Sequence, residues 1–337
     1  MRNHEIPVAA RGLLRTFAEA GLIRPIDFHL ARRMAQAFGE NRDEVELAFA
    51  LATRELRLGS VCLDLLEAEQ LQPESDVDDG LSGPQDTAVP WPTAEAWVSA
   101  VRDSDAVSDP DGPHRPFRLD GSLLYLERHF ADEHTVAERL RARSTLPLLP
   151  VAEAQLAATD ERLAARPDAD QDAAVRAALR NRTTVITGGP GTGKTTTVAR
   201  ILIALAADGS RPRVALAAPT GKAAGRLRGA VAEKLPPRAD LQLWDGTLHK
   251  LLGAAPRRAV PLHHRGNPLA FDAVVVDETS MVSLENMARL LDAVPHAPGV
   301  ARRPQPAAFR RSAGSAGRYR RDRSPDRRRG GWAATGA

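Results

Sequence analysis

The sequence predicts an α/β protein in three successive regions, and three patterns support this prediction. Residues 11–70 place apolar side chains three and four positions apart, which indicates amphipathic helices. From residue 171 onward, short apolar segments alternate with helical ones, which favours a parallel sheet with helices on both faces. Residues 298–337 are rich in Arg, Pro, Gly and Ala without apolar periodicity, which predicts a disordered basic tail.

The composition of the 337-residue chain excludes several classes of protein. No run of 18 or more apolar residues occurs, so we expect no membrane-spanning helix. The only cysteine, Cys62, excludes an internal disulfide framework and a cysteine-based zinc site, and the scattered histidines offer no metal-ligand spacing. The N-terminus lacks the apolar core of a secretory signal, so we expect a cytoplasmic protein.

The first domain is expected over residues 1–145. Helices are predicted in residues 12–23, 27–39 and 43–59, and the third has acidic residues in its first turn and Arg54 and Arg57 in its last, as the helix dipole favours. A short apolar segment follows at residues 60–65, and residues 72–92 form an acidic loop rich in Pro and Gly.

Its second half is predicted to mix helices with a hairpin. Residues 93–104 read as a short helix with Thr93 as its N-cap. Residues 117–130 contain two strand-like runs around Asp120-Gly121, a dipeptide suited to a type I′ turn. A helix at residues 132–143 then leads to a connecting segment at residues 146–170.

The second domain is expected over residues 171–297. Strands are predicted at residues 183–187, 213–219 and 272–278, with helices at residues 194–207 and 221–235 between them. Such a succession of short apolar strands and amphipathic helices is typical of a sheet buried on both faces.

The octapeptide at residues 188–195, GGPGTGKT, fits the P-loop pattern and lies between a predicted strand and a predicted helix. Glycines allow backbone N–H groups to surround phosphate oxygens, and the helix N-terminus adds the positive end of its dipole. We expect Lys194 to reach the β- and γ-phosphates of a nucleotide and the Thr195 hydroxyl to hold Mg²⁺.

The apolar strand AVVVDE supplies the acidic residues that a P-loop requires. Asp277 follows the strand at its carboxyl end, where the sites of open α/β sheets lie. We expect Asp277 to hold Mg²⁺ through water and Glu278 to polarise the attacking water.

Three further segments are candidate contacts. Gln171, 17 residues before Gly188, could bond an adenine edge or could be a solvated residue at a helix start. The segment at residues 218–227, APTGKAAGRL, ends a strand and opens a helix, a phosphate-sized site suited to a nucleic acid backbone. The segment TLHKLL adds Thr247, His249 and Lys250. Taken singly, each of these two segments is more typical of ordinary protein surface than of a DNA contact.

Four segments in this order resemble superfamily 1 DNA helicases: TGGPGTGKTTT, APTGKAA, TLHKLL and DETSM. The chain more closely resembles the RecD-type helicases, the alpha subunits of exodeoxyribonuclease V in the RecBCD complex. This closer resemblance depends on GSVCLDL and RLDGSLLYLERHFADEHTVAERLRAR, which look like the N-terminal domain of that subunit. It covers roughly residues 10–295.

The resemblance implies an ATP-driven motor that moves 5′→3′ on single-stranded DNA. Such a motor works with a beta helicase–nuclease and a gamma subunit, and the complex processes double-strand ends for recombinational repair. Two RecA-like domains hold ATP between them, of which residues 171–297 would be the first, while residues 1–145 would dock on the gamma subunit. The chain shows no nuclease arrangement of clustered acids and lysine, so we assign it no nuclease chemistry.

The resemblance also assigns roles residue by residue. Lys194, Asp277 and Glu278 would be catalytic, with Thr195 and Asp277 on the metal. The DNA contacts would be Thr220, Lys222, Ala223, Thr247 and His249. The ATP contacts would be Gln171, Gly188, Gly189, Pro190, Gly191, Thr192, Gly193, Lys194, Thr195 and Thr196.

The sequence departs from this family after Pro295. The family continues with a strand, a glycine–aspartate–x–x–glutamine–leucine segment and a second domain with arginine fingers. Here residues 301–337 hold 11 Arg and two acids. Codons for a family-like Gly-Asp-Pro-Asn-Gln-Leu-Pro-Ser-Val-Glu-Ala segment, started on the third base, can encode the run from Arg303 to Ser312. We therefore expect a frame shift between Pro295 and Arg303 and an out-of-frame tail at residues 298–337.

Three functional hypotheses remain open from the sequence. The first is a truncated RecD-type helicase subunit with little activity of its own. The second is a stand-alone superfamily 1 helicase. The third is a non-catalytic fragment that only docks on partner subunits. In each, the basic tail is an out-of-frame product unless it is a nucleic-acid-binding arm.

Overall fold

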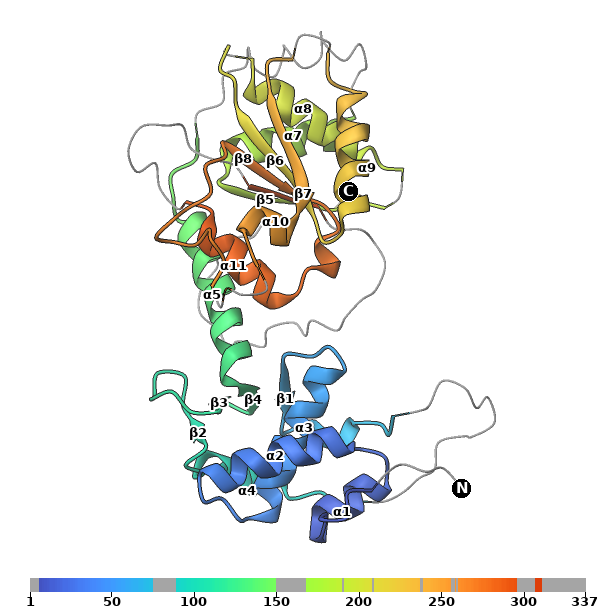
Figure 1. The fold of residues 1–337 in the computed structure, drawn as a ribbon, viewed down its shortest axis with the longest axis vertical. Coiled ribbons are helices and arrows are strands. Elements are labelled where there is room, and N and C mark those ends of the chain that lie inside the picture. The colour runs from blue at the N-terminus through green and yellow to red at the C-terminus, as the bar shows by residue number, and fades with distance from the viewer. Residues whose placement is uncertain are drawn as a thin grey trace, which may run out of the picture. The chain divides into compact units, whose positions relative to one another are not determined.

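The computed structural model describes the backbone and side chains of residues 6–74, 89–149, 168–189, 191–207, 209–236, 239–255, 258 and 260–295, and the backbone of residues 307–310. The chain divides into two compact units, residues 1–133 and 134–337 (Figure 1). Among the described residues, no helix is long and apolar enough to cross a membrane.

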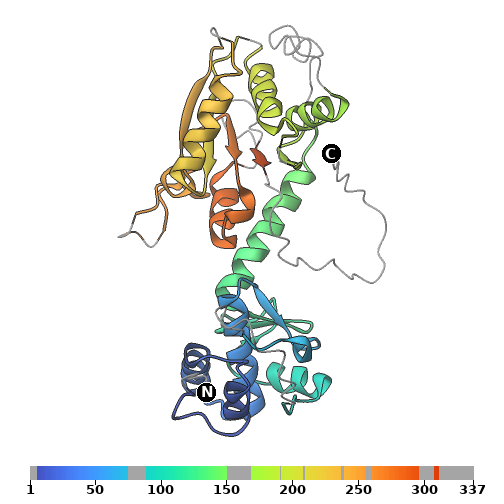
Figure 2. The same ribbon diagram turned by 90° about the vertical axis from the view of Figure 1, so that its right-hand side faces the viewer.

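The first unit is built around one buried helix. Helix α3 (Asp43–Arg57) has the predicted acidic first turn and basic last turn, and its central residues are fully buried. The ring of Phe49 on α3 stacks on Phe117, with the ring centroids 4.0 Å apart. The predicted helices are confirmed around α3 (Figure 2): α1 (Gly12–Glu19), α2 (Pro25–Ala37) and α4 (Ala94–Arg102).

A small sheet completes the first unit, in the strand order β1-β4-β3-β2. Its strands are β1 (Cys62–Asp64), β2 (Val107–Ser108), β3 (Phe117–Asp120) and β4 (Leu123–Leu126), and a short turn of helix, η1 (Ala68–Gln70), follows β1. Strands β3 and β4 form the predicted hairpin, but residues 127–130 of the range predicted for it are helical.

The predicted turn type of this hairpin is wrong. Asp120 pairs with Leu123, so Gly121 and Ser122 are the central residues of the turn. Gly121 has a φ of 63°, whereas Ser122 is not among the described residues with positive φ. A positive φ at the first central residue alone is the pattern of a type II′ turn, which requires glycine only there.

Helix α5 (Glu127–Ser144) begins in the first unit, but its second half belongs to the second. Arg143 is 4% exposed, and its guanidinium donates to the backbone carbonyls of Leu291 and Val294, each at 2.7 Å. Arg139 forms an ion pair of 3.0 Å with Asp292. Because these bonds attach residues 134–144 to the second unit, the boundary precedes the expected one at residue 145.

The second unit contains a five-stranded parallel sheet in the order β5-β9-β8-β6-β7, which confirms the predicted α/β class. The strands are β5 (Thr183–Ile186), β6 (Arg213–Ala218), β7 (Gln242–Thr247), β8 (Ala273–Val276) and β9 (Ala307–Arg310). The helices are α7 (Ala169–Arg180), α8 (Lys194–Leu205), α9 (Gly221–Ala232), α10 (Leu248–Leu252) and α11 (Leu284–Ala293), with a short turn of helix, η2 (Thr279–Met281).

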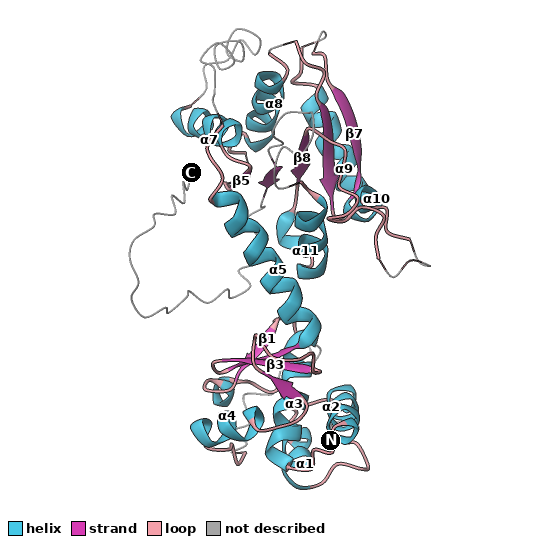
Figure 3. Cartoon of the chain, turned by 90° about the vertical axis from the view of Figure 1, so that its left-hand side faces the viewer, coloured by secondary structure: helices cyan, strands magenta, loops and turns pink. Residues whose placement is uncertain are grey.

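Helices cover both faces of this sheet, as predicted (Figure 3). Val214 and Leu216 of β6 pack in one cluster with apolar residues of α8 and α9. The alternate residues Ala215 and Ala217 pack in another with residues of α10 and α11. Side chains of a strand alternate between its two faces, so a strand buried on both faces must be apolar throughout.

Two strands differ from the prediction. Strand β7 was not expected, since its sequence QLWDGT includes Asp and Gly, which are depleted in strands. Strand β9 lies in the segment expected to be a disordered tail, and it pairs with both β5 and β8. The backbone groups of those two strands need partners inside the sheet, and an extended segment supplies them.

The rest of the predicted tail, residues 298–306 and 311–337, lies outside the described residues. The same holds for residues 75–88 of the acidic loop, residues 150–167 of the connecting segment, and Pro190.

Candidate functional site

The glycine loop connects β5 to α8 and depends on backbone conformations that favour glycine. Gly191 and Gly193 both have a φ of 78°, and Gly193 is the N-cap of α8. A Cβ added at Gly193 would lie 2.6 Å from the Gln171 amide nitrogen. Gly193 is therefore required both for its left-handed conformation and for the close approach of α7.

Lys194, the first residue of α8, folds back over this loop. Its Nζ donates to the carbonyl oxygens of Gly188 and Gly189, each at 2.5 Å. The ammonium group is thus centred on the loop, beside the N-terminus of a twelve-residue helix. Cation, helix dipole and glycine backbone together fit a phosphate group, whose oxygens would replace the two carbonyls as acceptors.

Gln171 lies in the first turn of α7, next to the loop. Its Nε2 donates to the backbone oxygen of Thr192 at 3.5 Å. A pocket of about 280 Å³ opens between α7, β5 and the loop, and Gln171, Ile186 and Lys194 are among its lining residues. The structure thus brings the glutamine to the loop, and its contact with adenine remains a prediction.

The acidic pair follows β8. Asp277 is 2% exposed, its N–H donates to the Ala217 carbonyl at 2.9 Å, and its Oδ1 accepts from the Glu278 N–H at 2.9 Å. Strands β5 and β8 run parallel, so their carboxyl ends lie at the same edge of the sheet. The glycine loop and the acidic pair therefore share that edge.

The oxygen atoms available at this edge suit a hard divalent cation. Thr195 lies in the first turn of α8, and Asp277 supplies a buried carboxylate. Hydroxyl and carboxylate oxygens are ligands that Mg²⁺ accepts alongside water and phosphate. The donor set therefore fits the predicted metal, while the assignment of these two residues as ligands remains a prediction.

The two candidate DNA-contacting segments lie side by side. Thr220 caps α9 by accepting from the Ala223 N–H at 3.3 Å, and Thr247 caps α10 by accepting from the Lys250 N–H at 3.2 Å. Ala218 pairs with Thr247 across β6 and β7, so both caps stand at the same sheet edge. Lys222 and His249 are exposed beside them.

Sequence reasoning missed one residue of this region. Arg226 of α9 reaches across to Glu278, with 3.5 Å between its Nη2 and the carboxylate Oε1. The signal was available, since Arg226 follows the predicted DNA contact Lys222 by four residues on the same helix face.

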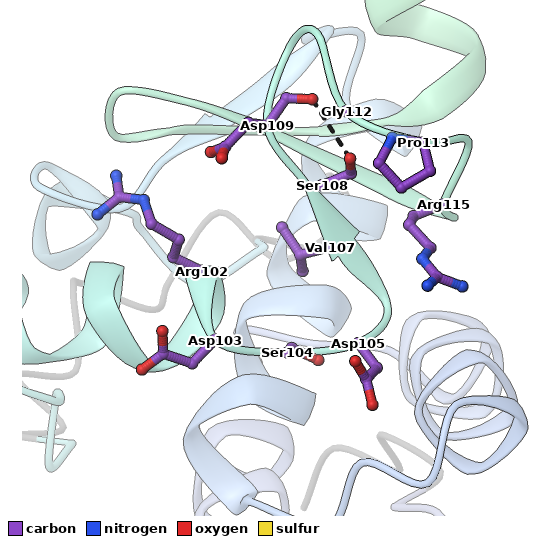
Figure 4. Close-up of a pocket in the computed structure, with 10 residues that line it drawn as sticks. All are labelled: Arg102, Asp103, Ser104, Asp105, Val107, Ser108, Asp109, Gly112, Pro113 and Arg115. Atoms are coloured by element: carbon purple, nitrogen blue, oxygen red, sulfur yellow. Dashed lines mark hydrogen bonds between the residues drawn. The ribbon is translucent and has the colours of Figure 1, made fainter.

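A second pocket, of about 300 Å³, lies in the first unit (Figure 4). Buried Arg118 fixes the loop beside it by donating to the backbone oxygens of Asp109 and Gly112. No motif in the sequence pointed to this pocket. Its lining residues are polar or charged apart from Val107, Gly112 and Pro113: Arg102, Asp103, Ser104, Asp105, Ser108, Asp109 and Arg115.

The second unit has the architecture of a P-loop nucleotide-binding protein, and comparison with known families supports this class. Residues 171–301 match a family model described as an AAA domain. Residues 19–125 match the N-terminal domain of RecBCD enzyme subunit RecD.

Two individual RecD subunits match most of the chain, and a RecD2 helicase matches about a third of it. RecBCD enzyme subunit RecD of Mycobacterium tuberculosis (strain CDC 1551 / Oshkosh) is 42% identical over 310 residues, which cover 86% of this chain and 49% of that protein. The same subunit of Mycolicibacterium smegmatis is 42% identical over 294 residues, which cover 84% of this chain and 49% of that protein. The ATP-dependent RecD2 DNA helicase of Deinococcus radiodurans is 41% identical over 115 residues, which cover 34% of this chain and 14% of that protein.

The chain belongs to the RecD family, with its N-terminal domain and AAA domain in the order that the sequence predicted. It spans about half the length of the curated relatives that it matches over most of its sequence.

Proposed function

We propose that this chain binds ATP with Mg²⁺ and supplies the first ATPase domain of a RecD-type DNA helicase subunit. One observation carries the proposal. Lys194 is centred on a glycine loop at the start of α8, at the same sheet edge as buried Asp277. This arrangement matches what nucleoside triphosphate binding requires: donors for phosphate oxygens and a carboxylate for the accompanying cation.

Each residue has a distinct proposed role. The loop N–H groups and Lys194 hold the β- and γ-phosphates, and Gln171 contacts the adenine edge. Thr195 and Asp277 hold Mg²⁺, which when bound neutralises charge on the phosphates. Glu278 orients and polarises the attacking water. The adjacent caps at Thr220 and Thr247, with Lys222, Ala223 and His249, follow the phosphates of a DNA strand.

The wider function follows from the RecD-type N-terminal domain. That domain favours a RecBCD-like subunit over a stand-alone helicase, because the match to RecD subunits includes it and covers 86% of the chain, whereas the match to a RecD2 helicase covers 34%. We propose that residues 1–133 dock on a gamma subunit beside a beta helicase–nuclease, in the cytoplasm. The assembled complex would translocate this subunit 5′→3′ on single strands at double-strand ends during recombinational repair.

Nucleotide titration tests the central claim. Purified wild-type chain and Lys194→Ala are titrated with a fluorescent ATP analogue in the presence and absence of Mg²⁺. We expect wild-type binding that strengthens with Mg²⁺, and a loss of about 10-fold or more in the variant, because one charged phosphate contact is removed. Equal, undetectable binding by both proteins would favour the docking-only hypothesis instead.

Turnover by the chain alone is proposed to be slow. Among the described residues that line the pocket, Lys194 is the one cation. Cations that reach the γ-phosphate from another domain raise the rate by about 10³–10⁵ in other nucleotide hydrolases. Phosphate release is measured with and without single-stranded DNA, with Glu278→Gln as the inactive control. Strong DNA-stimulated release by the chain alone would contradict this proposal.

A further inference from the structure

Glu278 has an unusual backbone conformation. With φ 54° and ψ 43°, it is the one non-glycine residue with positive φ among the described residues. For an L-residue with a long side chain, this left-handed conformation is disfavoured, and it persists only where neighbouring contacts maintain it. The Glu278 N–H donates to the Asp277 carboxylate, which fixes the backbone but not the Glu278 carboxylate.

Arg226 contacts that carboxylate. The Glu278 side chain is 18% exposed, whereas the Arg226 side chain is 71% exposed. An ion pair of 3.5 Å with so exposed a cation is weak and easily exchanged. Arg226 can therefore hold Glu278 and still be reached by a competing anion from solvent.

The competing anion has a defined direction of approach. Lys222 and Arg226 are four residues apart on α9, so they share one face of the helix. That helix begins at the Thr220 cap, where its dipole favours phosphate. A nucleic acid strand that contacts Lys222 would thus bring phosphates close to Arg226. Arg228, two residues further on, is paired with Asp245 instead.

We propose that Arg226 is a positioning residue that couples strand binding to Glu278. Without DNA, Arg226 holds the Glu278 carboxylate. When single-stranded DNA lies along α9, its phosphates attract Arg226 and release Glu278 for its role at the attacking water. This inference depends on the proposed function for the role of Glu278, but its central step, the exchange of Arg226 between a carboxylate and a phosphate, is a binding event.

The exchange is tested by a double-mutant cycle that requires no ATP turnover. Affinity for a fluorescent 20-mer of thymidine is measured by anisotropy for wild type, Glu278→Gln, Arg226→Gln and the double variant. We expect Glu278→Gln to bind about 3-fold tighter, because Arg226 no longer has to leave a carboxylate. The slope of log affinity against log salt should steepen by up to about 0.7, the value for one phosphate contact on a single strand, because only the wild type must break the Arg226–Glu278 ion pair to make that contact.

The double variant shows why Glu278→Gln binds the oligonucleotide more tightly. If the higher affinity depends on Arg226, Glu278→Gln has no effect on affinity in the Arg226→Gln background. If the gain only reflects removal of a negative charge near DNA, the two substitutions are additive and the inference is overturned. Arg226→Lys should restore part of the gain, since it keeps the charge.

Arg228→Gln is the matched control on the same helix, and Glu278→Gln should keep its full effect in that background. Oligonucleotide binding that is absent from every variant also overturns the inference, because Arg226 then has no phosphate to contact. Failure of the proposed function is seen separately, as equal nucleotide binding by wild type and Lys194→Ala.

Discussion

Arg143 provides a direct test of how α5 is attached to the second unit. Its guanidinium is buried and donates to the carbonyls of Leu291 and Val294, in the last turn and at the C-cap of α11. Such carbonyls have no partner within their own helix. Replacing Arg143 with Met keeps most of the buried volume but leaves both oxygens without this donor.

The loss of stability in Arg143→Met can be calculated from these two hydrogen bonds. A hydrogen bond from a charged donor contributes about 1.5–3 kcal/mol, so two bonds suggest about 3–6 kcal/mol. The desolvation of the guanidinium opposes this, and the same burial lowers the pKa of Arg143 to about 10. We therefore expect a net loss near the lower end, about 3 kcal/mol. If the free energy of unfolding falls by about 2 kcal/mol per molar urea, the urea midpoint of unfolding should fall by about 1.5 M.

Urea denaturation followed by circular dichroism measures the midpoint, and hydrogen exchange of peptides from α11 locates the change. Arg141→Met is the matched control, because Arg141 is an exposed residue of the same helix. Its effect should stay within about 0.5 kcal/mol. Equal midpoints for Arg143→Met and Arg141→Met, with α11 equally protected, would refute the attachment of α5 through Arg143.

Three further predictions concern other sites. Gly193→Ala should weaken nucleotide binding about 10-fold, because residue 193 has a φ of 78° and its added Cβ would lie 2.6 Å from the Gln171 amide nitrogen. Gly209→Ala is the control: residue 209 has a similar φ of 76° but no atom within 4 Å of the added Cβ, so nucleotide binding should be unchanged. Burial raises the pKa of Cys62 from 9.0 to about 11, so its alkylation at pH 8 should be about 100-fold slower in the native chain than in urea, and equal rates would contradict the burial. The Arg42 side chain holds the pKa of Glu40 at about 2, below its ordinary 4.5, so the stability difference between wild type and Glu40→Gln should be complete above pH 4.5 and disappear as the pH falls towards 2 in urea titrations at several pH values.

The sequence by itself determined the class of both units. The 3.6-residue apolar period of a helix and the short apolar run of a buried strand are both local patterns, so the helices α1 to α4 and the strands β5, β6 and β8 could be predicted from neighbouring residues alone. The P-loop was equally accessible, because all of its residues lie in one short segment. Strands β7 and β9 could not be predicted, since QLWDGT and AAFR have little strand character of their own and form strands by pairing with β6, β5 and β8.

Tertiary structure alone decided what distant segments do together. The contacts of Gln171 with the loop, of Arg143 with α11 and of Arg226 with Glu278 join residues 21, 148 and 52 positions apart. No periodicity in the sequence encodes such pairs, because the packing of whole helices against the sheet brings them together. The backbone of Glu278 is the clearest case: an acidic residue after an apolar strand was predicted, but its left-handed conformation depends on contacts that exist only in the folded sheet.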